Sequence, residues 1–278
     1  MNNDTIVAEQ NSLERLIARD KTVTSFMLVL MTALAAAYTI FGVGMPMSAL
    51  DMTISISGSN SQMPMMMKPM WTFNYTILVF LMWWIMMVAM MLPSAAPTIL
   101  LYTALIRKAN KAENIKKMIM VFTLGYLITW AFFSLLATLL QSGLEAKEWM
   151  SPMMMTLTND ILIAITLIIA GFYQLTPIKY ACLEKCRNPA SFLAENRNMG
   201  GNVALKMGLK HGVYCLGCCW FLMGLLFVGG IMNLYWILGL TIFVALEKLA
   251  PKGQTIAKVA GLLAGMMGVY QLAITIST

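Results

Sequence analysis

The sequence predicts an all-α integral membrane protein, a polytopic bundle of about seven transmembrane helices with its N-terminus inside the cell and its C-terminus outside. Hydrophobic residues make up 59% of the 278-residue chain and charged residues 11%, which is too apolar for an ordinary soluble domain. Several apolar runs are long enough to cross roughly 30 Å of hydrocarbon at about 1.5 Å per residue. The basic residues are also concentrated in every second connection between these runs.

Seven apolar segments are expected to cross the bilayer, and together they form a single membrane domain over residues 25–278. Residues 1–24 are polar and mixed in charge, unlike a cleaved signal peptide, so we interpret them as a cytoplasmic tail followed by a retained anchor. The fourth span is short, and the fifth and sixth are divided at Gly229-Gly230. The expected spans are 25–44, 75–92, 118–141, 160–176, 212–230, 231–247 and 257–276.

Basic residues gather in every second connection between these spans. They fall in the N-terminal tail and in segments 94–117, 177–211 and 248–258, whereas the other connections contain only Lys68 and Lys147 of the 19 basic residues. The positive-inside rule assigns the basic side to the cytoplasm. A chain with six spans would break this alternation, so the charge pattern favours seven. The basic residues of these connections also account for the net charge of +7. The charge therefore does not indicate nucleic-acid binding, and we expect no nucleic-acid partner.

All five cysteines and the single histidine lie within residues 182–219, in the pattern Cys182-x3-Cys186 and His211-x3-Cys215-x2-Cys218-Cys219. At about 100° per residue, the second group shares one face of a helix over about two turns. Thiolates and imidazoles are ligands for soft metals. Cysteine is also an ordinary small packing residue in membrane helices, which is the alternative interpretation. The predicted metal ligands, for Cu(I) or Zn(II), are Cys182, Cys186, His211, Cys215, Cys218 and Cys219.

The 28 methionines are a second candidate source of soft ligands, because a thioether binds Cu(I) without deprotonation. Met82, Met86 and Met90 recur at every fourth position of the second span, before the break at 91–97. Methionines in such a row usually pack in the core of a helical bundle. The functional alternative is that they form a path for copper. Packing does not require methionine in the outward segment 45–74. A possible outer site is therefore expected there, formed by Met63, Met65, Met66, Met67 and Met70.

Glu247 is an ionisable residue near the cytoplasmic end of the sixth span, followed by Lys248. We expect it either to support the metal ligands from outside or to anchor the helix at the interface. The chain has one histidine, no Gly-x-Ser-x-Gly string and no phosphate-binding glycine loop. We therefore assign no catalytic or cofactor-binding residues, and an ATP-driven pump is not expected from this chain alone.

Four strings resemble a prokaryotic domain-of-unknown-function family catalogued as predicted metal-binding integral membrane proteins. They are MMVAMMLPSAAP (86–97), GFYQLTPIKYACLEKCRNP (171–189), HGVYCLGCCW (211–220) and VALEKLAPKG (244–253). The resemblance implies a multi-span membrane protein whose metal site contains the cysteines and the histidine, with no established reaction. The methionine-rich outward segment is not part of it.

The preferred hypothesis is a protein of the prokaryotic cytoplasmic membrane that binds and transfers a soft metal, with Cu(I) favoured over Zn(II). Its partners would be the lipid bilayer, other subunits of a membrane complex, or a metal-delivery protein. One alternative is a non-catalytic subunit or assembly factor with a structural metal. A second is a membrane thiol oxidoreductase that uses Cys215 and Cys218, although cysteines on the cytoplasmic side of the membrane disfavour disulfides.

Overall fold

A computed structural model describes residues 3–42, 49–50, 53, 71–108, 115–151, 155–194 and 201–277, with side chains described from residue 22 onward except at 201 and 202. The chain is mostly helical, as predicted, and the described residues include a short antiparallel strand pair in which Met150 pairs with Leu157. The helices and strands are α1 (Asn3–Phe41), α3 (Phe73–Lys108), α4 (Ile115–Ala146), β1 (Met150–Ser151), β2 (Thr156–Leu157), α5 (Asp160–Gln174), α6 (Pro177–Arg187), α7 (Pro189–Ala194), α8 (Gly201–Gly224), α9 (Leu226–Gly229), α10 (Leu234–Leu249) and α11 (Gly253–Ser277).

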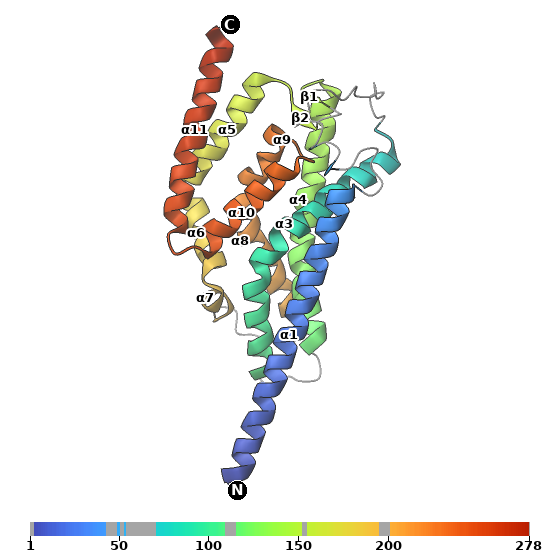
Figure 1. Cartoon of the computed structure of the whole chain (residues 1–278), viewed down its shortest axis with the longest axis vertical. Coiled ribbons are helices and arrows are strands. Elements are labelled where there is room, and N and C mark those ends of the chain that lie inside the picture. Colours follow the sequence, from blue (N-terminus) through green and yellow to red (C-terminus); the bar gives the residue numbers. More distant parts are fainter. Residues whose placement is uncertain are drawn as a thin grey trace.

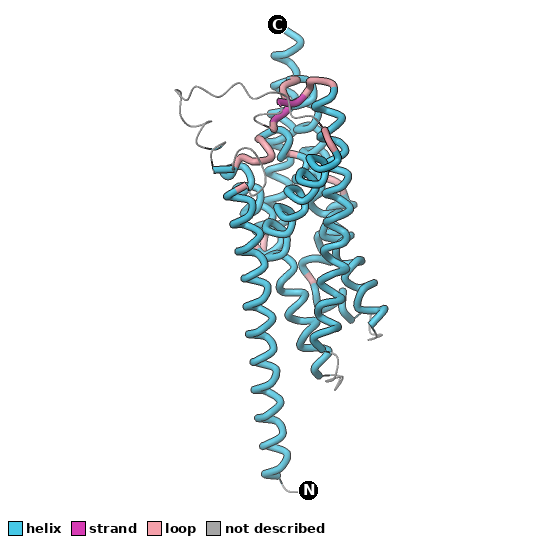
Figure 2. The backbone as a smooth tube through the Cα atoms, turned by 90° about the vertical axis from the view of Figure 1, so that its right-hand side faces the viewer, coloured by secondary structure: helices cyan, strands magenta, loops and turns pink. Residues whose placement is uncertain are grey.

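The long helices form a bundle whose members run roughly along one axis (Figures 1 and 2). Helix α1 packs on α3, α3 on α4, and α4 on α8, while α5 and α11 form a pair beside them. The two ends of the chain lie at opposite ends of the molecule (Figure 1). The region predicted as an N-terminal tail is part of α1, which begins at Asn3.

Five helices in the described ranges are long and apolar enough to cross a membrane, or six if α5 and α6 count as one bent span. With α5 and α6 counted as one span, they lie near six of the seven predicted spans. The remaining one, 231–247, corresponds to α10, whose 16 residues are fewer than the roughly 20 that a perpendicular helix needs. The turn before α10 contains Gly230 with φ of 97°, a left-handed conformation that favours glycine, at the boundary that the sequence indicates.

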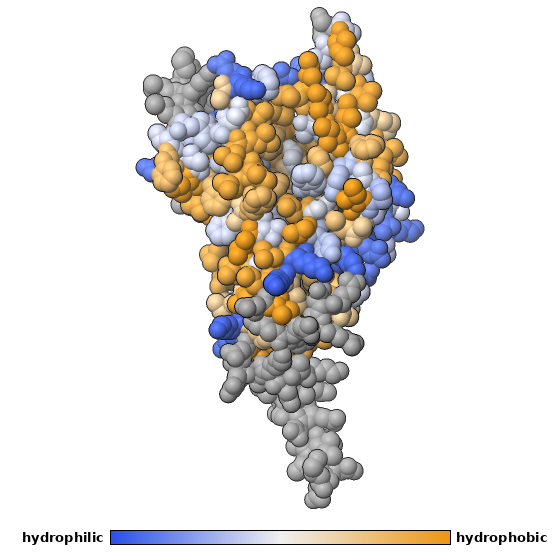
Figure 3. Space-filling model, turned by 180° about the vertical axis from the view of Figure 1, so that it is seen from behind, coloured by the Kyte–Doolittle hydropathy of each residue, from blue (hydrophilic) through white to orange (hydrophobic). Residues whose placement is uncertain are grey.

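Large apolar side chains remain exposed over much of the bundle. Figure 3 shows apolar residues over much of one face, interspersed with paler ones, and hydrophilic residues gathered mainly at its edge, its top and its lower part. On α11 the exposed residues include Leu262, Leu263, Met266 and Met267. An apolar surface of this extent is unfavourable in water and is typical of a surface that faces lipid. The fold is therefore compatible with a multi-pass membrane protein.

The segment 177–211, predicted as a cytoplasmic loop, contains α6, α7 and the first half of α8. Helix α6 bends away from α5 by 63°. The bend has a local cause, because Thr176 has extended backbone angles and Pro177 occupies the first turn of the new helix. Thr176 caps α6 by accepting a hydrogen bond from the backbone N–H of Lys179. This bend turns the first cysteine pair toward α8.

Helices α4 and α8 approach each other through glycine. A Cβ atom at Gly208 of α8 would lie 2.0 Å from the carbonyl oxygen of Phe122 on α4, so no larger residue fits at this separation. The close approach brings the hydroxyl of Tyr126 on α4 to 3.2 Å from the Cys215 sulfur on α8.

Candidate metal centre

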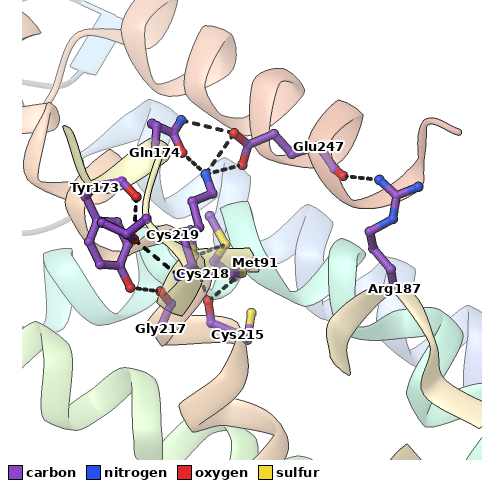
Figure 4. A network of polar contacts seen from close by, with 11 residues as sticks. Met91, Tyr173, Gln174, Arg187, Cys215, Gly217, Cys218, Cys219 and Glu247 are labelled. Atoms are coloured by element: carbon purple, nitrogen blue, oxygen red, sulfur yellow. Dashed lines mark hydrogen bonds and ion pairs between the residues drawn. The ribbon is translucent and has the colours of Figure 1, made fainter. Parts of the chain in front are cut away.

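Two helices carry the predicted ligands and pack against each other. Helix α6 carries Cys182 and Cys186, and α8 carries His211 and the other three cysteines. Gly217 lets α6 come close, because a Cβ atom there would lie 2.8 Å from the Cys182 sulfur. The Tyr173 hydroxyl, at the end of α5, fixes this junction by donating a hydrogen bond to the Gly217 carbonyl (Figure 4).

Four thiols gather where the helices meet. Cys186 on α6 lies close to Cys215 and Cys218 on α8, and Cys219 lies close to the same two residues. We call Cys186, Cys215, Cys218 and Cys219 the thiol cluster. Its three α8 members are buried, whereas Cys186 is half-buried, and all five cysteines are free thiols. Cys182 is also half-buried and lies at the edge of the cluster, against Gly217.

The thiols of α8 also interact with their own helix. The Cys218 and Cys219 sulfurs lie 3.1 and 2.9 Å from the Cys215 carbonyl oxygen and donate to it (Figure 4). In the part of the chain that the structure describes, no three His, Cys, Asp or Glu side chains are arranged so that they could hold a metal ion together. The thiols therefore lie near one another, but no three of these side chains are directed toward a common position at which they could bind one ion.

Lys248 of α10 is a charged neighbour of the cluster. Its Nζ atom lies 3.0 Å from the Cys215 sulfur and donates a 2.9 Å hydrogen bond to Ser94 Oγ on α3. The lysine is 6% exposed, so this positive charge is held inside the protein. Burying an ammonium group is costly unless polar or negative groups surround it, which makes Lys248 a natural counter-charge for a thiolate.

Glu247, expected either to support the ligands or to anchor its helix, has partners outside the thiol cluster. Both of its carboxylate oxygens accept 2.8 Å hydrogen bonds from Lys179 Nζ, and one accepts a 3.0 Å bond from Gln174 Nε2 (Figure 4). Lys179 also donates to the Gln174 amide oxygen. Arg187 donates to the Glu247 backbone carbonyl and thus ties the end of α6 to the end of α10. Glu247 therefore joins helices, and its neighbour Lys248 contacts the thiols.

His211 lies one turn before Cys215 on α8 and is 2% exposed. Aromatic rings surround it, with ring centroids of Phe192, Tyr126 and Phe122 at 5.4, 5.7 and 6.2 Å. Among the described residues its Nδ1 atom has no hydrogen-bond partner. A buried nitrogen of this kind is uncommon, because buried polar atoms are nearly always hydrogen-bonded.

Sequence reasoning did not assign Tyr126, Ser94, Lys248 or Met91 to the site. The Met91 sulfur lies 3.9 Å from the Cys219 sulfur. Lys248 could have been noticed as a charge within an apolar span, whereas Tyr126 and Ser94 give no signal in the sequence. The proposed outer methionines Met63, Met65, Met66, Met67 and Met70 lie outside the described residues.

Comparison with known proteins gives one result. The model of the PpoB2 family, described as a copper chaperone, matches residues 80–271, which is more than half of the chain. The chain belongs to the PpoB2 copper chaperone family. No curated protein and no solved structure matches the chain.

The PpoB2 match includes every cysteine, His211 and Lys248. Its description gives the protein a copper-related role, in agreement with the preference for copper over zinc drawn from the sequence. The description lends no support to Zn(II) or to thiol oxidation as the function.

Proposed function

We propose that this protein binds Cu(I) at the thiol cluster and transfers it to a partner protein at the membrane. The observation that supports this most directly is the proximity of Cys186 to Cys215 and Cys218, which lie on another helix. These residues are far apart in the sequence, and packing alone does not require thiols on both sides of a helix contact. Thiolates are preferred ligands of Cu(I), which forms complexes with two or three sulfur atoms.

His211 is a proposed ligand at the edge of the cluster. Its unpartnered Nδ1 supports this role, because a metal ion would satisfy a nitrogen that otherwise lacks a hydrogen bond. The outer methionines are proposed to collect copper, and the buried row Met82, Met86 and Met90 on α3 leads from that side toward the cluster.

The test is the copper content of protein purified anaerobically without chelator. We expect roughly one Cu(I) per chain, because the cluster offers thiols enough for one two- or three-coordinate ion. Less than about a tenth of an equivalent, combined with failure to retain added Cu(I), would contradict the proposal and leave the cysteines as packing residues.

We further propose that seven segments cross the cytoplasmic membrane of a prokaryote with the N-terminus inside. The basic connections and the opposite positions of the two ends of the chain in Figure 1 support this arrangement. A reporter fused after Thr278 is then expected outside, and a reporter inserted near Lys111 inside. Finding both reporters on the same side would exclude this orientation.

A further inference from the structure

Met91 is the last of five buried methionines on α3, after Met82, Met86, Met87 and Met90. It directly precedes Leu92 and Pro93, at the position where the helix carries two internal prolines. Its side chain is fully buried, and its sulfur lies 3.9 Å from the Cys219 sulfur (Figure 4). The methionine row of α3 therefore ends in contact with the thiol cluster.

The backbone of Met91 is also linked to the cluster. Its carbonyl oxygen accepts hydrogen bonds from Tyr126 at 3.0 Å and Ser94 at 2.8 Å. The Tyr126 hydroxyl in turn lies 3.2 Å from the Cys215 sulfur. Ser94 accepts from Lys248, whose Nζ atom contacts that same sulfur. The Met91 sulfur thus contacts Cys219, and the Met91 carbonyl is linked to Cys215 through Tyr126 and through Ser94 and its partner lysine.

The sulfur separation fits two ligands of one copper ion. A metal–sulfur bond of about 2.3 Å, the length found for zinc thiolates, and a trigonal angle of about 120° would separate two sulfurs by about 4.0 Å. The distance from Met91 Sδ to Cys219 Sγ is 3.9 Å. The two sulfurs therefore need little movement to bind the same ion.

Charge also favours a thioether as the third ligand. Cu(I) with two thiolates carries one net negative charge, which the single ammonium of Lys248 balances. A third thiolate would leave an uncompensated negative charge beside buried groups, which is costly at low dielectric. A methionine sulfur completes a trigonal set of soft ligands and adds no charge.

We propose that Met91 Sδ is a ligand of the Cu(I) ion held by the thiol cluster, so that the centre contains both thiolate and thioether sulfur. This inference rests on the proposed function. It makes Met91 the point at which copper arriving along α3 first meets a cysteine.

The experiment uses the full chain labelled with selenomethionine and loaded anaerobically with one equivalent of Cu(I). X-ray absorption at the copper edge then distinguishes selenium, present only in methionine, from cysteine sulfur. We expect a copper–selenium shell in the unsubstituted protein. This shell should be absent from the Met91→Leu variant and retained in Met87→Leu. Met87 is a matched control because it is equally buried and lies one helical turn away.

Leucine is close to methionine in volume, so both variants should keep their packing and melting temperature. We also expect Met91→Leu to bind Cu(I) at least about 10-fold more weakly, as loss of even an outer-shell partner costs about 10–100-fold. Bound copper with sulfur ligands alone in the unsubstituted protein would overturn the role of Met91 and leave the proposed function intact. A selenium shell that persists in Met91→Leu would do the same. Failure of the unsubstituted protein to retain any copper would overturn both.

Discussion

Replacing Cys186 or Cys219 with serine is expected to remove most of the copper that the protein retains. Each change substitutes a hard, poorly ionised hydroxyl for a soft thiolate, and the remaining ligands are fixed on packed helices and cannot rearrange freely. Cys186 and Cys219 lie on different helices, and each lies close to Cys215 and Cys218. We therefore expect the affinity for Cu(I) to fall by at least about 100-fold in either variant, because losing an outer-shell partner alone costs about 10–100-fold.

The measurement is competition for Cu(I) against a chromophoric chelator, with the variants purified in parallel. Cys182→Ser is the matched control, since Cys182 lies one turn before Cys186 on α6 and contacts Gly217 at the edge of the cluster. We expect a smaller loss in this variant. If Cys186→Ser binds copper as tightly as the unsubstituted protein, the cluster does not bind the ion through α6. If Cys182→Ser loses the most, the ligand on α6 is Cys182.

Replacing Lys179 with methionine is expected to be the most destabilising single change. Lys179 and Glu247 form a 2.8 Å ion pair in which the side chains are 0% and 1% exposed. Removing the lysine leaves a buried carboxylate whose remaining side-chain partner is Gln174. Loss of one member of a buried pair costs about 3–5 kcal/mol, and we expect an effect of that size on the free energy of unfolding.

Thermal unfolding of detergent-solubilised protein measures this effect. Lys252→Met is the control, because Lys252 is exposed and its loss should change little. A double variant with Lys179→Met and Glu247→Leu should recover part of the lost stability, since apolar replacement of both partners removes the unpaired charge. If Lys179→Met melts together with the Lys252→Met control, the ion pair does not hold α6 to α10.

Much of the fold could be predicted from the sequence because the bilayer imposes simple rules on length and hydrophobicity. The helices lie near the predicted spans, and the boundary at Gly230 is confirmed. The sequence left open whether segment 177–211 is helical. Its polar composition resembles a loop, whereas the cap formed by Thr176 and Pro177 starts a new helix there. The predicted span 231–247 is close to α10 in length, but it begins in the turn before the helix because apolar residues continue across that turn.

The candidate site was predictable in its cysteines and much less so in its surroundings. The spacing of Cys215, Cys218 and Cys219 fixes a common helical face, which one sequence can reveal. The contacts of Tyr126 and Lys248 depend on how α4 and α10 pack against α8, and no spacing within one helix encodes them. For the same reason the sequence could not show that Glu247 pairs with Lys179.

The unequal burial of the cluster has a consequence for ligand exchange. The thiols contributed by α8 are buried, whereas Cys182 and Cys186 on α6 are half-buried. If the cluster holds copper as proposed, an incoming thiol or imidazole from another protein would meet the α6 sulfurs first, while the α8 sulfurs still hold the ion. Such an exchange would replace one copper–sulfur bond at a time, so that Cu(I) need not be released into water. Because Lys179 and Arg187 fasten α6 to α10, the same contacts that stabilise the fold also keep the exchanging sulfur in a fixed place.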